Sequence, residues 1–190
     1  MPDAFFFGYG SLVNRSTHDY ADARRARVRG WRRQWRHTRL RDVAYLTVAP
    51  APAGEIEGLI AAVPGNDWQL LDQREHAYDR LHLDQGQVDH DHAHEILVHM
   101  YRTKPGNDAA PSVRNPILLS YLDTVLCGYL DLFGTAGVDR FFATTDGWDS
   151  PVLDDRKNPV YGRAVVASAA RMRLIDQRLD DHAVRRIRQT

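Results

Sequence analysis

Hydrophobic runs of strand length dominate the first half of the chain. Three aromatic residues at positions 5–7 precede the segment Gly8-Tyr9-Gly10-Ser11-Leu12, a pattern that predicts a buried strand ending in a glycine turn. Apolar residues alternate or cluster between turn residues in four further ranges, and these predict strands over 28–35, 43–48, 56–63 and 96–101.

The hydrophobic period changes to that of a helix further along the chain. The spacing predicts helices over 68–83, over 116–133 with Pro116 in the first turn, over 138–144, and at the basic C-terminus. A loop is expected over 104–115, an irregular segment over 148–161, and a strand over 162–169. Because no segment resembles a linker, we expect a single domain covering residues 1–190. The mixture of predicted strands and helices corresponds to an α+β fold.

Composition and charge limit the binding partners and the cellular location that can be expected. The chain has 25 basic and 25 acidic residues, so no overall field favours nucleic acid or an anionic membrane. Its only cysteine, Cys127, lies in an apolar pattern typical of an inert core thiol. Neither a signal-peptide pattern nor a membrane-spanning run is present in the sequence, and a cytoplasmic protein is therefore expected.

Residues 24–41 form the most basic stretch, in which arginines interleave with Trp31 and Trp35. Such a stretch can stack on single-stranded nucleic acid, or it can be a strand whose outer face is solvated by arginine. The zero net charge favours the second interpretation, and no nucleic-acid partner is expected.

One carboxylate falls inside an apolar stripe. On the predicted helix over 68–83, Glu75 shares a face with Leu71, Tyr78 and His82, and Leu70 and its row widen that face. Asp72 and Asp79 are expected on the outer side. A buried glutamate has a raised pKa and can act as a base near neutral pH, whereas an ion-paired glutamate at the edge of the stripe is the structural alternative.

The glycine turn 8–12, taken together with the segment Leu71-Asp72-Gln73-Arg74-Glu75-His76-Ala77-Tyr78, resembles the γ-glutamylcyclotransferase superfamily, including its ChaC-type branch. Lesser matches are Val28-Arg29-Gly30-Trp31, Thr47-Val48-Ala49-Pro50 and Ser120-Tyr121. The resemblance covers about the first two thirds of the chain. It implies a small closed mixed β-barrel flanked by helices, without metal or organic cofactor, in a monomer or homodimer.

The resemblance also implies a reaction. The α-amine of a γ-glutamyl peptide or amine attacks its own γ-carbonyl, which gives 5-oxoproline and a free amine. Glu75 would be the general base and acid. Tyr9, Gly10, Ser11, Leu12, Tyr78 and Tyr121 would bind the substrate, with backbone N–H groups of the turn on the developing oxyanion. A non-catalytic γ-glutamyl or small-amide binding protein is the alternative.

Four other features of the sequence bear on function. His90, His92 and His94 would share one side of an extended chain, but we expect at most opportunistic metal binding there. Ser11 lacks the Gly-x-Ser-x-Gly elbow of a hydrolase, and Gly8-x-Gly10 lacks the third glycine of a dinucleotide site. Segment 148–161, which departs from the family pattern, either closes over the site or packs against the core; packing is favoured.

Overall fold

The computed structural model describes residues 3–104 and 108–188. Within these residues, the main sheet has the strand order β4-β6-β1-β3-β2-β5, and β7 and β9 pair with β2. Its strands are β1 (Asp3–Gly8), β2 (Arg24–Thr38), β3 (Ala44–Ala62), β4 (Tyr78–His82), β5 (Val88–His90), β6 (Ile96–Thr103), β7 (Asp108–Ala109) and β9 (Thr145–Asp146). A small parallel sheet consists of β8 (Ile117–Leu118), β10 (Val152–Asp154) and β11 (Arg186–Arg188).

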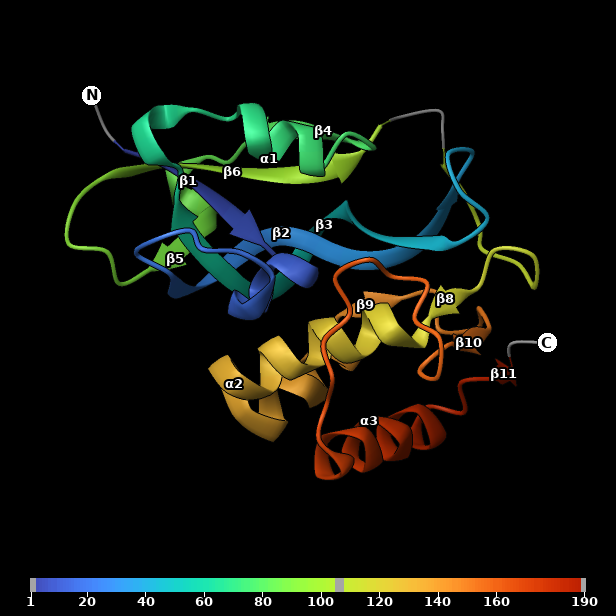
Figure 1. Cartoon of the computed structure of the whole chain (residues 1–190). Coiled ribbons are helices and arrows are strands. Elements are labelled where there is room, and N and C mark those ends of the chain that lie inside the picture. Colours follow the sequence, from blue (N-terminus) through green and yellow to red (C-terminus); the bar gives the residue numbers. More distant parts are fainter. Residues whose placement is uncertain (1–2, 105–107, 189–190) are drawn as a thin grey trace.

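Three α-helices are assigned among the described residues: α1 (Gln69–Arg74), α2 (Leu119–Ala143) and α3 (Ala169–Asp181). Helix α1 lies on the side of the main sheet formed by β4 and β6, and α2 and α3 lie on the opposite side (Figure 1). The mixed α+β class is therefore confirmed.

The main sheet is an open path rather than the closed barrel that the resemblance implies. Side chains, not a backbone ladder, join β4 and β6 to the first half of β3. The backbone N–H and the hydroxyl of Thr103 both lie 3.0 Å from Thr47 Oγ1, and the Tyr78 hydroxyl donates to the Leu46 carbonyl at 3.0 Å. The gap between these strand ends adjoins the pocket described below.

The two longest strands form a bent antiparallel hairpin. Strand β2 pairs with β3 from Arg24 opposite Ile60 to His37 opposite Ala44, and the register shifts between Arg29 and Trp31. Gly30 lies at this shift with φ of 85°, a conformation that other residues rarely adopt, so the bulge depends on glycine.

Both faces of β1 are buried, which explains its run of aromatic residues. Phe5 and Phe7 enter the core shared with α2, whereas Phe6 enters a second cluster with Leu71 and Tyr101. A strand covered on both sides is continuously apolar rather than alternating. Cys127 is free and buried in α2, as expected for a core thiol.

The predicted helix over 68–83 is wrong in its length. Helix α1 ends at Arg74, and the chain continues as strand β4 from Tyr78. Leu70, expected to widen the apolar face, is 72% exposed. The apolar positions over 71–82 match the spacing of a helix by chance, because this range contains the end of a helix, a turn and a short strand.

The later elements also differ from expectation. Pro116 precedes β8, and α2 begins at Leu119 and runs through the predicted 138–144 helix. Gly134 interrupts it with φ of 65° and ψ of −166°, which is not helical. No strand forms over 162–169; the backbone N–H of Val165 in that segment donates to the Thr124 hydroxyl of α2 instead of to a neighbouring strand.

Tryptophan and arginine side chains of the basic stretch 24–41 pack inside the protein. Trp35 is 1% exposed in the core, and Trp31 packs against that core. Arg33 is fully buried on the same face and donates to the Tyr129 hydroxyl at 2.6 Å and the Glu57 carbonyl at 2.5 Å. The tryptophan rings are therefore committed to internal packing.

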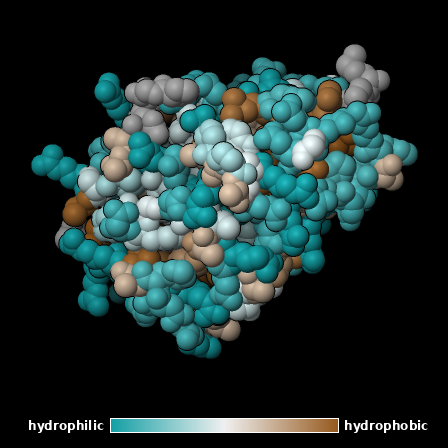
Figure 2. All heavy atoms as spheres, turned by 180° about the vertical axis from the view of Figure 1, so that it is seen from behind, coloured by the Kyte–Doolittle hydropathy of each residue, from teal (hydrophilic) through white to brown (hydrophobic). Residues whose placement is uncertain are grey.

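The face seen from behind is hydrophilic over most of its area, with scattered hydrophobic residues (Figure 2). Among the described helices, none is long and apolar enough to cross a membrane.

Candidate functional site

A cavity of about 720 Å³ opens beside the gap between β3 and β4. Glu75, Tyr78, Ser11, Leu46 and Tyr121 line its inner end and also border a recess of about 30 Å³ that continues to the glycine turn. The recess is completed by Phe7, Gly8, Tyr9, Gly10, Leu12 and Tyr101. All seven residues predicted for the site thus line two adjoining cavities.

The carboxyl group of Glu75 lies at this junction although the predicted helix does not reach it. Glu75 is the C-cap of α1, and its backbone N–H donates to the Leu71 carbonyl at 2.9 Å. The side chain is 16% exposed. Burial raises the pKa of Glu75, and the nearby cations of Arg74 and Arg163 lower it in part. The raised pKa makes the carboxylate a stronger base than an exposed glutamate and suits it to accept and return a proton.

Arg74 is a site residue that the sequence did not single out. Its Nε lies 3.2 Å from Glu75 Oε1, and its Nη1 donates to the Thr17 carbonyl at 3.0 Å. Its Nη2 lies 3.4 Å from the Ser11 hydroxyl. Arg74 consequently links the carboxylate to the glycine turn. In the sequence it resembles any helical arginine, so no pattern could have identified it.

Gly10 is required by a close contact rather than by a positive φ. Its φ is −114°, and a Cβ built there would lie 2.6 Å from the Tyr121 hydroxyl. A Cβ at Gly8 would lie 2.6 Å from that of Leu12. Neither Gly8 nor Gly10 has a positive φ; the missing side chains instead allow Tyr121 and Leu12 to approach the turn.

Four tyrosines line the recess together with the Glu75 carboxyl. Tyr9 donates to the Tyr101 carbonyl at 2.6 Å, and the Tyr101 hydroxyl donates to Asp72 Oδ1 at 2.5 Å. Burial raises the pKa of Tyr9, Tyr78 and Tyr121, so these phenols stay neutral. Neutral phenols can orient polar groups by hydrogen bonds, but they leave Glu75 as the titratable group of the recess. Asp72, expected as a plain surface charge, is half-buried.

Segment 148–161 has two parts, one packed against the core and one on the wall of the cavity. Trp148 packs against the core, stacked on Phe142 with ring centroids 4.4 Å apart, as the packing interpretation predicts. Val160 and Tyr161, however, line the cavity, so packing is the wrong interpretation for the end of segment 148–161. Arg163 follows them on the cavity wall.

The histidine run lies elsewhere. His92 Nε2 is 3.1 Å from Asp22 Oδ2, and the His92 ring meets Phe5 edge-on at 5.1 Å. Within residues 3–104 and 108–188, no group of three or more His, Cys, Asp or Glu side chains is arranged to hold a metal ion.

Together, the α+β fold and a cavity with a buried carboxyl at its inner end define a small protein with an open pocket of small-molecule size. Residues 6–116 match the family model described as gamma-glutamyl cyclotransferase, AIG2-like. The chain belongs to this family, which confirms the resemblance seen in the sequence.

Solved structures support the fold. A structure described as gamma-glutamyl cyclotransferase is 15% identical with a TM-score of 0.57, and the alignment covers 92% of this chain and 99% of that one. The uncharacterized protein loc79017 from Homo sapiens is 16% identical with a TM-score of 0.57, covering 90% and 97%.

YkqA from Bacillus subtilis is 17% identical with a TM-score of 0.57; the alignment covers 77% of this chain and 57% of YkqA. No curated protein sequence matches the chain significantly.

Proposed function

We propose that the protein is a γ-glutamylcyclotransferase that converts γ-glutamyl peptides or amines to 5-oxoproline and the free amine. The observation that carries the proposal is the position of Glu75, a buried carboxyl with a raised pKa at the junction of the pocket and the glycine turn. Family membership supports the reaction class.

The proposed reaction needs one group that moves a proton twice. The Glu75 carboxylate takes a proton from the substrate α-ammonium, and the free amine attacks the γ-carbonyl carbon. As the bond from that carbon to the leaving nitrogen breaks, the protonated Glu75 gives its proton to the departing amine. The lactam nitrogen then still carries one excess proton, which the regenerated Glu75 carboxylate takes and passes to the released amine, so that atoms and charges balance without a further reactant.

The remaining site residues have positioning roles in this proposal. The turn at Gly10 and Ser11 lies beside the carboxyl, where its backbone N–H groups can stabilise the oxygen of the tetrahedral intermediate. Arg74 limits the rise in the pKa of Glu75, because a neighbouring cation favours the carboxylate. A cavity with this narrow inner recess favours a folded substrate, which brings the amine to the carbonyl.

The test is release of 5-oxoproline from glutathione, a γ-glutamyl dipeptide and a γ-glutamyl amine by the purified chain. Glu75→Gln preserves the shape of the side chain but removes the base, so turnover should fall by about 10²- to 10⁴-fold. Glu95→Gln, at an exposed position outside both cavities, is the matched control and should retain full turnover. Full turnover by Glu75→Gln would refute the assignment.

The same materials distinguish the alternative of a non-catalytic binder. If calorimetry measures tight binding of an intact γ-glutamyl compound to the wild-type chain and no product forms over hours, the binding interpretation replaces the enzymatic one.

A further inference from the structure

The segment between β10 and α3 crosses the molecule toward the main sheet before it turns back into α3 (Figure 1). We call residues 155–168 the strap. It has no regular secondary structure and lies beyond residues 6–116, which match the family model. Its position against the pocket therefore depends on specific contacts.

The first contact anchors the start of the strap to α2. The Asp155 side chain is fully buried; its Oδ1 accepts from the Ser120 backbone N–H at 2.8 Å, and its Oδ2 accepts from the Ser120 hydroxyl at 2.6 Å. The same Oδ2 accepts from the backbone N–H of Val160 at 2.9 Å, which folds the strap back on itself.

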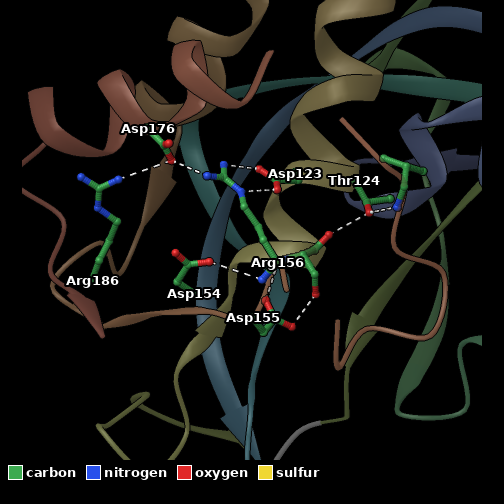
Figure 3. A network of polar contacts seen from close by, with 9 residues as sticks. Asp123, Thr124, Asp154, Asp155, Arg156, Asp176 and Arg186 are labelled. Atoms are coloured by element: carbon green, nitrogen blue, oxygen red, sulfur yellow. Dashed lines mark hydrogen bonds and ion pairs between the residues drawn. The ribbon is translucent and has the colours of Figure 1, made fainter. Parts of the chain in front are cut away.

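A neighbouring ion-pair network reinforces this anchor. The Arg156 guanidinium binds both oxygens of Asp123, at 2.7 and 2.8 Å, and also Asp176 of α3 at 2.8 Å (Figure 3). Arg186 approaches the same Asp176 at 3.4 Å. Such bidentate, partly buried pairs fix geometry more strongly than a single exposed pair. The strap is thereby tied to two helices at once.

A second tether follows the pocket-lining residues. The backbone N–H of Val165 donates to Thr124 Oγ1 at 3.2 Å. Between this tether and that at Val160, the Tyr161 ring meets Tyr121 edge-on, with centroids 5.0 Å apart and planes at 87°. Arg163 lies in this short fixed span and is near enough to lower the pKa of Glu75.

The outer part of the pocket is basic. Four arginines from separate segments line it: Arg41, Arg114, Arg163 and Arg188. Among the described residues, none of the four guanidinium groups makes an ion pair. The acidic side chains on the pocket lining are Asp42 and Glu75, and Glu75 is already paired with Arg74. In a chain of zero net charge, this imbalance is local to the pocket.

We propose that the strap is a specificity element, in which Arg163 and the arginines at the pocket mouth select γ-glutamyl compounds whose leaving amine is an acidic amino acid. The inference rests on the proposed function. With the glutamyl group at Glu75, the leaving group extends toward the basic mouth. A side-chain carboxylate there, added to the α-carboxylate, gains a charged partner that a neutral leaving group lacks.

The test compares γ-glutamylglutamate with γ-glutamylglutamine, which differ by one charge and little in shape. The wild-type chain should show a kcat/KM about three- to tenfold higher for the acid, and added salt should reduce that ratio. Arg163→Gln should lower kcat/KM more for the acid than for the amide, which brings the ratio close to one. Arg173→Gln, at an exposed position on α3 outside the pocket, is the control and should leave the ratio unchanged.

Equal kcat/KM values for the two compounds in the wild-type chain would overturn the inference, and so would an equal loss for both in Arg163→Gln. If the wild-type chain releases 5-oxoproline from neither compound and also from none of the substrates named under the proposed function, the proposed function fails. Calorimetry with the same two compounds then decides the charge preference by itself: tighter binding of the acid supports it, and equal or absent binding refutes it.

Discussion

Replacement of Asp155 by alanine is the sharpest test of how the strap is held. Leu118, the N-cap of α2, provides no side-chain hydrogen bond to the helix, so the Asp155 carboxylate satisfies the otherwise free N–H of Ser120 from 35 residues away in sequence. Asp155→Ala leaves that buried N–H without an acceptor, which costs about 2 kcal/mol. The Ser120 hydroxyl and the N–H of Val160 each lose a charged acceptor, at about 1 kcal/mol apiece since both can find other partners.

The expected total is a loss of about 3–5 kcal/mol in the free energy of unfolding, including the favourable charge near the helix N-terminus. For a chain of 190 residues this lowers Tm by about 6–20 °C. Urea unfolding followed by tryptophan fluorescence and circular dichroism measures the loss. The adjacent Asp154→Ala is the control: Asp154 is exposed and accepts one bond of 3.3 Å from Arg156, so its loss should be about 0.5 kcal/mol. Equal losses in the two variants would refute the assigned role of Asp155.

Three further predictions concern the recess. Burial raises the pKa of Glu75, so kcat/KM should fall as the pH drops through that pKa. Arg74→Gln removes a cation that lowers this pKa, so the acidic limb of the pH profile should move to higher pH. An unmoved acidic limb would exclude the assigned interaction between Arg74 and Glu75. The native state binds the Glu75 proton more tightly than the unfolded chain does. The free energy of unfolding of the wild-type chain should therefore decline, relative to that of Glu75→Gln, as the pH rises from about 4.5 through the pKa of Glu75 in the folded state. Urea unfolding at a series of pH values measures this difference. Gly10→Ala should displace Tyr121 and raise KM, whereas an unchanged KM would show that the turn tolerates a Cβ.

The sequence predicted the strands better than the ends of the helices. Strand β1 carries a run of aromatic residues, and burial on both faces requires such a run. The segment around Glu75 misleads because an apolar period of 3.6 over 71–82 is matched by chance where a helix ends and a strand begins. Glu75 lies at the pocket for a tertiary reason: the helix stops there, and the chain turns toward β6.

Contacts between distant segments could not be predicted in the same way. The apolar run within 162–169 predicts a strand that does not form, and the position of the strap depends instead on buried polar pairs such as Asp155 with Ser120. The polarity of Asp155 and Arg156 in the sequence is typical of a loop, and nothing local distinguishes a buried carboxylate from a solvated one. The arginines of the pocket mouth come from four segments, so their shared location follows only from the fold.

Helix α2 is the common support of the glycine turn and the strap. A Cβ at Gly128 would lie 2.7 Å from the backbone nitrogen of Asn14, and the Asn14 side-chain amide donates to the Thr124 carbonyl at 2.8 Å. One turn of the helix therefore fixes the chain that follows the glycine turn. The Thr124 hydroxyl also accepts a hydrogen bond from the backbone N–H of Val165 in the strap. Tyr121, one turn earlier in α2, lines the pocket. Because a single rigid helix positions both parts, a shift of α2 would alter the recess and the basic mouth together, whereas Asp155→Ala releases the strap and leaves the contact at Asn14 in place.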